Sequence, residues 1–185
     1  MANGTLKVSN IETSSGSGTI TIGQSGETVA LGSGVTSQFN QPAFEARLSS
    51  DQTISDDTFT KISVNEEVFD TDSCYDNSTN YRFTPTVAGK YYIYWSCSGI
   101  ASSNNVVNSN VFIYKNGTQY NGGSIAGNSA ISGGSSIALA TIDFNGSTDY
   151  VEFYLKVDAA SGTVKAEHDF SGGNTTFAGA YRIGA

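Results

Sequence analysis

The segment that decides the fold begins at residue 42 and reads Pro42-Ala-Phe-Glu-Ala-Arg-Leu-Ser-Ser-Asp-Gln-Thr-Ile54. Three blocks follow it in order: Thr60-Lys-Ile-Ser-Val-Asn65, Val68-Phe-Asp-Thr71 and Tyr81-Arg-Phe-Thr-Pro-Thr-Val-Ala-Gly-Lys-Tyr-Tyr-Ile-Tyr94. From Pro42 onward the chain is a run of short alternating segments with turns between them, and no helical periodicity of useful length interrupts it. This pattern predicts an all-β, two-sheet antiparallel sandwich over residues 42–185.

Composition limits the classes of function. The 185 residues suffice for one domain with or without an arm, and 21 glycines, 2 prolines and a 14% share of charged residues are typical of a turn-rich β protein. A net charge of −8 opposes binding to nucleic acid. No segment is long and apolar enough to cross a membrane, and residues 1–8 lack the apolar run of a signal peptide, so we expect synthesis in a cytoplasm.

Several strands can be assigned to faces. The alternation in 150–158 and 90–99 predicts that Phe153, Leu155, Tyr91 and Ile93 point into the core. Asn116-Gly117 and Asn145-Gly146 each predict a hairpin turn, the second joining strand 137–144 to strand 150–158. Gly179 should leave room for a facing aromatic ring, and the Gly/Ser-rich stretches 122–136 and 159–174 are predicted to be exposed loops.

The quoted blocks resemble, in register, the globular heads of the complement component 1q and tumour necrosis factor superfamily. The matching elements are Pro42-Ala-Phe44, Phe69-Asp70, Phe83-Thr84-Pro85, Ala88-Gly89-Lys90-Tyr91 and the closing Phe177-Ala-Gly-Ala-Tyr-Arg-Ile183. The resemblance covers residues 42–185. It implies a jelly roll that packs as a threefold bundle through one aromatic-rich sheet and has no catalytic centre.

Residues 1–41 differ from the rest and form a Gly/Ser-rich arm with three β-like segments. Each segment is too short to make its own core, which predicts an arm that orders on a partner or on its own copies; a flexible linker is the alternative. The apolar residues expected to anchor the arm are Leu6, Val8, Ile20, Ile22, Val29 and Leu31.

Few residues suggest a chemical site. Asp70, Asp72 and Asp76 lie close in sequence and could suit a hard cation such as calcium, but the standard calcium loop is not matched and a polar turn between strands is the favoured interpretation. The single histidine, His168, has no nucleophile motif beside it, and Glu167 and Asp169 point away from its face if this segment is extended. Cys74 and Cys97 are expected to be free thiols. We therefore predict no enzyme and no cofactor.

Tyrosine is the remaining signal. Tyr92, Tyr94 and Tyr154 lie on the faces opposite the expected core, and amphipathic tyrosine suits a surface that a partner buries, although simple β-propensity explains it too. The resemblance makes these three residues candidates for a homotrimer interface.

The two ends of the chain, 1–11 and 179–185, resemble those of structural proteins in marine tailed bacteriophages. The expected function is therefore a trimeric capsid decoration protein or short tail appendage on a virion surface, which contacts other capsid or tail components. The alternative is a carbohydrate-binding module that recognises host surface glycans.

Overall fold

The computed structural model describes residues 41–102, 105–170 and 172–184, together with Ile11 and Ile20. The chain separates into two units, Met1–Phe39 and Asn40–Ala185. Of the residues expected to anchor the arm, Ile20 is described; it is exposed and lies in no strand. The other five, Leu6, Val8, Ile22, Val29 and Leu31, lie outside the described residues. Nowhere in the described part does a helix occur that could span a membrane.

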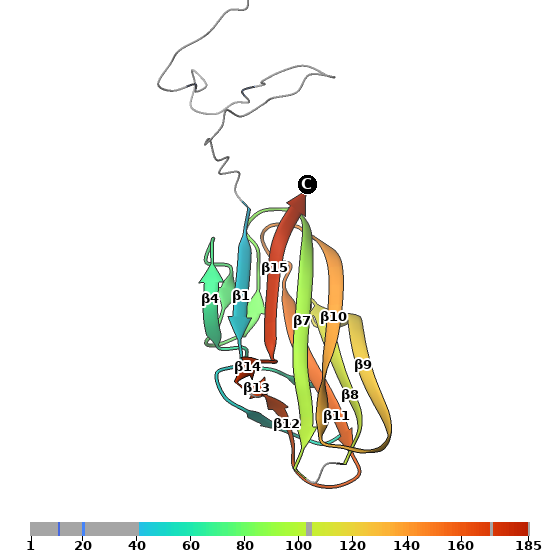
Figure 1. The fold of residues 1–185 in the computed structure, drawn as a ribbon. Helices are drawn as coiled ribbons and strands as arrows, with labels where there is room; N and C mark the ends of the chain where they lie inside the picture. The colour runs from blue at the N-terminus through green and yellow to red at the C-terminus, as the bar shows by residue number, and fades with distance from the viewer. Residues whose placement is uncertain (1–10, 12–19, 21–40, 103–104, 171, 185) are drawn as a thin grey trace, which may run out of the picture. The chain divides into compact units, whose positions relative to one another are not determined.

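Two antiparallel sheets make up the second unit (Figure 1), which confirms the predicted jelly-roll sandwich. The first, called the β7 sheet, contains β1 (Ala43–Arg47), β2 (Gln52–Ile54), β4 (Glu66–Asp70), β7 (Gly89–Ala101), β10 (Gly133–Phe144), β12 (Val164–Glu167) and β15 (Phe177–Gly184). The second, called the β11 sheet, contains β3 (Thr60–Lys61), β5 (Tyr75–Asp76), β6 (Arg82–Phe83), β8 (Val106–Lys115), β9 (Thr118–Ile131) and β11 (Val151–Ala159). The short strands β13 (Asp169–Phe170) and β14 (Gly173–Asn174) pair with each other.

The central strand β7 organises the first sheet. Along one edge β7 pairs with β10, and along the other it pairs first with β15 and then with β12. Beyond β15 lie β1 and then β4, as Figure 1 shows. In the β11 sheet the order is β5, β6, β11, β8 and β9.

The core lies between the two sheets, where the inward faces meet. Tyr91 and Ile93 of β7 and Phe153 and Leu155 of β11 are fully buried, which confirms the predicted faces of both strands. Trp95 ties the sheets together, because its indole N–H donates across the core to the Tyr154 carbonyl at 3.0 Å.

Of the two predicted hairpins, one is confirmed and one is wrong. Asn116 and Gly117 have φ of 51° and 76° and join β8 to β9 in the way a two-residue hairpin requires. Asn145-Gly146, however, carries the chain from the β7 sheet to the β11 sheet, so β10 and β11 do not pair. The physical reason is a wider turn: the Asn145 side-chain oxygen accepts the N–H groups of residues 147, 148 and 149.

The predicted loop 122–136 is wrong as well, because most of it lies in β9 and β10. Glycine here serves close packing: a Cβ at Gly122 would lie 2.8 Å from the Phe112 ring, and one at Gly123 would collide with the Ile137 carbonyl. Side chains of β9 then cover the free edge of β10, since the Asn121 amide donates to the Leu139 carbonyl at 2.5 Å. The second predicted loop, 159–174, contains β12, β13 and β14.

Candidate interaction face

The outward side of the β7 sheet carries a cluster of large apolar side chains, which we call the aromatic face. The antiparallel register places its members in adjacent rows: Tyr181 lies beside Tyr92, and Leu139 lies beside Tyr94. The strands involved are neighbours in the sheet, as Figure 1 shows. The aromatic face consists of Tyr92 and Tyr94 of β7, Ile137 and Leu139 of β10, and Phe177 and Tyr181 of β15.

The aromatic rings are held by one another and by Glu45. The ring centroids of Tyr92 and Tyr181 are 5.5 Å apart, and those of Tyr94 and Phe177 are 6.2 Å apart. Tyr94 lies across Gly179, where any Cβ would collide with its ring, so the predicted role of this glycine is confirmed. The Tyr94 hydroxyl donates to Glu45 Oε2 at 2.9 Å. Burial and this carboxylate raise the pKa of Tyr94, which keeps the hydroxyl a donor.

Much apolar surface on this face is open to water. The exposed fraction is 58% for Ile137, 47% for Tyr181 and 46% for Leu139. Single exposed apolar residues are ordinary, but a contiguous group on a flat sheet is characteristic of a surface that a partner covers. The aromatic face is therefore the best candidate for an interaction site.

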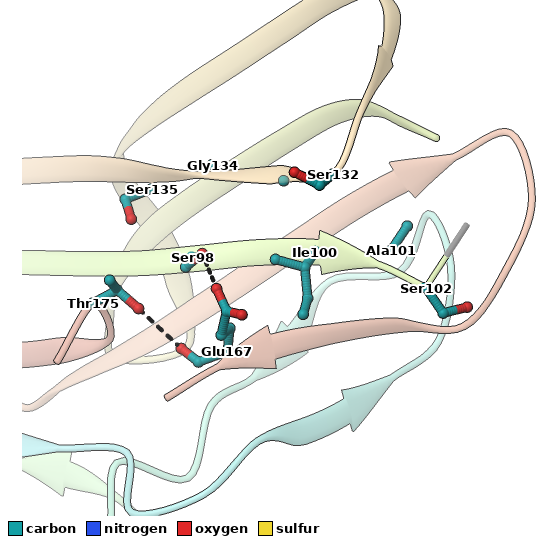
Figure 2. A pocket seen from close by; sticks show the side chains of 10 residues that line it. Ser98, Ile100, Ala101, Ser102, Ser132, Gly134, Ser135, Glu167 and Thr175 are labelled. Atoms are coloured by element: carbon teal, nitrogen blue, oxygen red, sulfur yellow. Dashed lines mark hydrogen bonds between the residues drawn. The ribbon is translucent and has the colours of Figure 1, made fainter. Parts of the chain in front are cut away.

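A hollow of about 480 Å³ lies on the same sheet, at the end of β7 away from Tyr92 (Figure 2). Most of the residues that line it are small, among them Ser98, Gly133 and Ser135. Its one carboxylate belongs to Glu167, whose Oε2 accepts from the Ser98 hydroxyl at 3.1 Å. The Thr175 hydroxyl donates to the Glu167 carbonyl at 3.4 Å. The hollow therefore presents hydroxyl and carboxylate oxygens beside the aromatic face.

The structure separates the three tyrosines that were predicted to share an interface. Tyr92 and Tyr94 lie together on the aromatic face, whereas Tyr154 lies on the outward side of the β11 sheet. There its ring stacks on Tyr114 with centroids 4.2 Å apart. The sequence reasoning overlooked Ile137 and Leu139, although the alternation in β10, which buries every second residue, carries that signal.

The three carboxylates proposed for calcium are engaged in local turns. Asp70 Oδ2 accepts the Tyr75 N–H at 2.7 Å, and Asp72 accepts the Thr86 hydroxyl. Asp76 accepts backbone N–H groups of the turn that follows it, chiefly that of Thr79, and these bonds lower its pKa. No group of three metal-ligating side chains converges anywhere in the described part of the chain.

His168 is exposed, and its Nδ1 lies 2.9 Å from Asp51 Oδ1. Asp169 was expected to point away only if the segment is extended, and Asp169 Oδ1 in fact lies 3.7 Å from His168 Nε2. Strand β12 ends at Glu167, so the side-chain alternation assumed for this segment does not continue through His168.

Both cysteines are buried free thiols, as predicted. Burial raises the pKa of the Cys97 thiol to about 12 and also raises the pKa of Cys74. Neither thiol is therefore an activated nucleophile.

Comparison with known proteins bears on the fold. No family model and no curated protein matches the chain. Among solved structures, the globular domain of zebrafish complement 1qA is 14% identical and covers 77% of this chain and 97% of its own, with a TM-score of 0.54. Eiger TNF from S. frugiperda is 11% identical, covering 77% and 91%, with a TM-score of 0.55. Murine APRIL at pH 5.0 is 9% identical, covering 78% and 100%, with a TM-score of 0.56. The chain thus has the complement 1q and tumour necrosis factor fold.

Proposed function

We propose that this protein is a non-enzymatic structural protein that assembles as a homotrimer through its aromatic face. The observation that carries the proposal is the contiguous exposure of Ile137, Leu139 and Tyr181 beside the half-buried Tyr92 and Tyr94. Tyrosine and large apolar side chains are enriched where protein surfaces are buried against each other. The sequence resemblance of residues 42–185, which implies a threefold bundle through one aromatic-rich sheet, supports the same use of this face.

Burial of the aromatic face against a second copy would be favourable. Removing a half-exposed Leu or Ile side chain from water stabilises an assembly by about 1–2 kcal/mol, and several such residues act together here. Tyr92 and Tyr94 are already packed on neighbouring rings, so little side-chain entropy is lost when they are covered. A rigid apolar sheet face is thus well suited to self-association.

The groups that would serve catalysis are engaged otherwise. His168 bonds to Asp51 at the surface, and no serine or cysteine among the described residues forms a hydrogen bond with its ring. The two thiols have raised pKa values. These contacts support a role in which the protein presents a surface and performs no reaction.

The place of action that we propose is the surface of a tailed-bacteriophage virion. The support is the resemblance of residues 1–11 and 179–185 to the ends of marine phage structural proteins. In this proposal the sandwich projects as a capsid decoration or short tail appendage, and residues 1–41 join it to a capsid or tail component.

Light scattering tests the assembly. The wild-type chain should have a mass three times 19.4 kDa at micromolar concentration. Leu139→Asp places a charge in the proposed contact and should raise the dissociation constant at least tenfold. The matched control is Val107→Asp, which introduces the same charge at an exposed residue of β8 outside the aromatic face. A monomeric wild type, or equal effects of both variants, would refute the contact.

Labelling of purified particles tests the location. Antibodies against residues 42–185 should decorate the capsid or tail of the virus that encodes the chain. Deleting residues 1–36 should leave a folded trimer that no longer joins particles. Particles without label, or a truncated protein that still occupies them, would overturn the virion role or the anchoring role respectively.

A further inference from the structure

One cation in the described part of the chain, Arg47, has no partner. Its Nε–H is buried and has no hydrogen-bond acceptor. The other described lysines and arginines all have partners: Lys61, Lys90, Lys115, Lys156 and Lys165 pair with carboxylates, Arg82 lies 4.5 Å from the Tyr150 ring centre, and Arg182 donates to the Ala88 carbonyl. A buried donor without an acceptor is costly, which indicates that an acceptor comes from outside this set.

Arg47 lines a second hollow, of about 320 Å³, together with Glu45, Asn174 and Phe177. The strand register places Arg47 directly beside Phe177 and Glu45 beside Gly179, so these side chains share the outward side of the β7 sheet. Asn174 belongs to the neighbouring strand β14. The volume lies within the range of small-molecule sites in proteins.

The walls of this hollow are held in place before any ligand arrives. Tyr94 donates to Glu45 Oε2 at 2.9 Å, which fixes that carboxylate. The Phe177 ring packs against Tyr94 with centroids 6.2 Å apart. Phe177 is half-buried, so part of its ring is available to a ligand. Such support from a second layer of residues reduces the entropy lost when a ligand binds.

We propose that this hollow binds a neutral sugar ring. A hexopyranoside offers hydroxyl oxygens to the guanidinium of Arg47 and hydroxyl donors to the carboxylate of Glu45. The Asn174 amide both donates and accepts, and the apolar side of the ring fits against Phe177. A sugar hydroxyl would supply the acceptor that the Arg47 Nε–H lacks.

The charges around Arg47 favour a neutral ligand over an anion. Glu45 lines the same hollow, and Glu66 stands opposite Arg47 in the β1–β4 ladder without forming an ion pair with it. A carboxylate or phosphate would be repelled by both. Glu66 is exposed, so the buried Nε–H does not find its acceptor there. Sugar hydroxyl groups can accept from the Arg47 guanidinium and donate to the Glu45 carboxylate without adding charge.

The site is separate from the centre of the proposed trimer contact. Ala43 lies beside Tyr181, and Arg47 is four residues further along β1, which corresponds to about 13 Å. Phe177 belongs to both the aromatic face and this hollow, so the sugar site lies at the edge of the proposed contact. The unpaired Nε–H of Arg47 is nevertheless an observation that does not depend on the trimer.

Saturation-transfer NMR on the full-length protein tests the proposal. The probes are the methyl glycosides of glucose, galactose, mannose and N-acetylglucosamine, each at 10 mM, because single sugars bind in the millimolar range when few groups contact them. At least one glycoside should receive saturation. Arg47→Lys removes the Nε–H and the planar guanidinium, and Phe177→Leu removes the ring; each should weaken binding at least fivefold. Arg82→Lys, at an arginine of the β11 sheet, is the matched control and should bind as wild type.

Circular dichroism melting confirms that each variant is folded before binding is compared. Binding that both Arg47→Lys and Phe177→Leu retain would place the sugar elsewhere and overturn the proposal. The absence of saturation in all four glycosides with folded wild-type protein would overturn it as well. Because none of these readouts measures mass, failure here leaves the trimer to be judged by light scattering.

Discussion

The outward sides of the two sheets both carry aromatic rings, but the groups that surround those rings differ. On the β11 sheet Lys156 lies 5.3 Å from the Phe59 ring centre and 2.7 Å from Asp57, and Tyr154 stacks on Tyr114. On the β7 sheet Ile137 and Leu139 stand exposed. On the first surface charged groups lie among the rings, whereas on the second the exposed apolar residues are contiguous and leave an area for a partner to cover.

This difference shows that the number of exposed tyrosines is a poor guide to an interface. Cations and carboxylates interspersed among rings keep a sheet face hydrated, and they oppose burial because their desolvation is costly. Lys61 and Glu152, paired at 3.1 Å on the β11 sheet, are one such obstacle. The aromatic face has aliphatic neighbours in their place, and these make its rings useful for assembly.

The largest expected effect on stability comes from comparing a variant on the inner side of β11 with one on its outward side. Phe153→Ala should lower the free energy of unfolding by about 3–5 kcal/mol, because a fully buried ring packed against Trp95 leaves a cavity. Tyr154→Ala, one residue further on, should cost about 1 kcal/mol through its lost stacking on Tyr114. Urea unfolding at a fixed protein concentration measures both, since assembly couples to stability.

The same pair of variants sharpens the comparison of the two faces. Tyr154→Ala should leave the trimer mass unchanged in light scattering, because its ring lies on the β11 sheet, outside the proposed contact. A monomeric Tyr154→Ala protein would show that the β11 sheet is the contact. A loss below about 1 kcal/mol in Phe153→Ala would contradict the assignment of inner and outward sides.

A smaller effect is expected on the aromatic face itself. Gly179→Ala adds a methyl group where the Tyr94 ring lies, so the ring must move and its bond to Glu45 must break. Overpacking of this kind costs about 1–3 kcal/mol, which calorimetry measures as a lowered melting temperature. Ala180→Gly, at a buried neighbour, is a control for backbone effects. A melting temperature equal to wild type would mean that Tyr94 does not occupy this position in solution.

The sequence predicted the layers of the fold and the inward sides of β7 and β11, because period-two alternation of apolar residues has one physical cause. It did not predict strand pairing after Asn145-Gly146. That turn looks like a hairpin turn locally, and the choice between pairing and crossing to the other sheet depends on which inner face must be buried. The glycines of β9 led to the wrong loop prediction for a similar reason. Glycine is favoured both where strands pack closely and where a loop is flexible, and the sequence alone does not separate the two.

The candidate site was predictable only in part. Tyr92 and Tyr94 were identified from their side of β7, but their partners come from β10 and β15, which are distant in the chain. Arg47 could not be predicted from the sequence. What sets it apart is a buried Nε–H without an acceptor, and this can be recognised only once the contacts of the side chains around it are known.

The smallest expected effect concerns the edge of the β7 sheet, where charges pair as they do on the β11 sheet. His168 is the one histidine of the chain, so an imidazole signal can come from no other residue. Its bond to Asp51 lowers the pKa of Asp51 from 3.8 to about 2 and raises the pKa of His168 above 6.5. The Asp51 contribution to stability is therefore present above pH 3.8 and is lost as the pH falls toward 2. The His168 contribution is present below pH 6.5 and is lost as the pH rises through its raised pKa, so the pair is strongest between about pH 4 and 6.5.

A proton NMR titration of the single imidazole measures this pairing directly. Asp51→Asn removes the carboxylate that raises the pKa of His168 most, so the pKa of His168 should fall in this variant. Asp143→Asn, on β10, should leave the titration unchanged. Both groups are largely exposed, so salt at 1 M should reduce the shift in wild type as well. If Asp51→Asn and wild type titrate alike at low salt, the pair does not form in solution. The imidazole at this edge would then lack Asp51 as a partner, as the exposed apolar residues of the aromatic face lack partners within the chain.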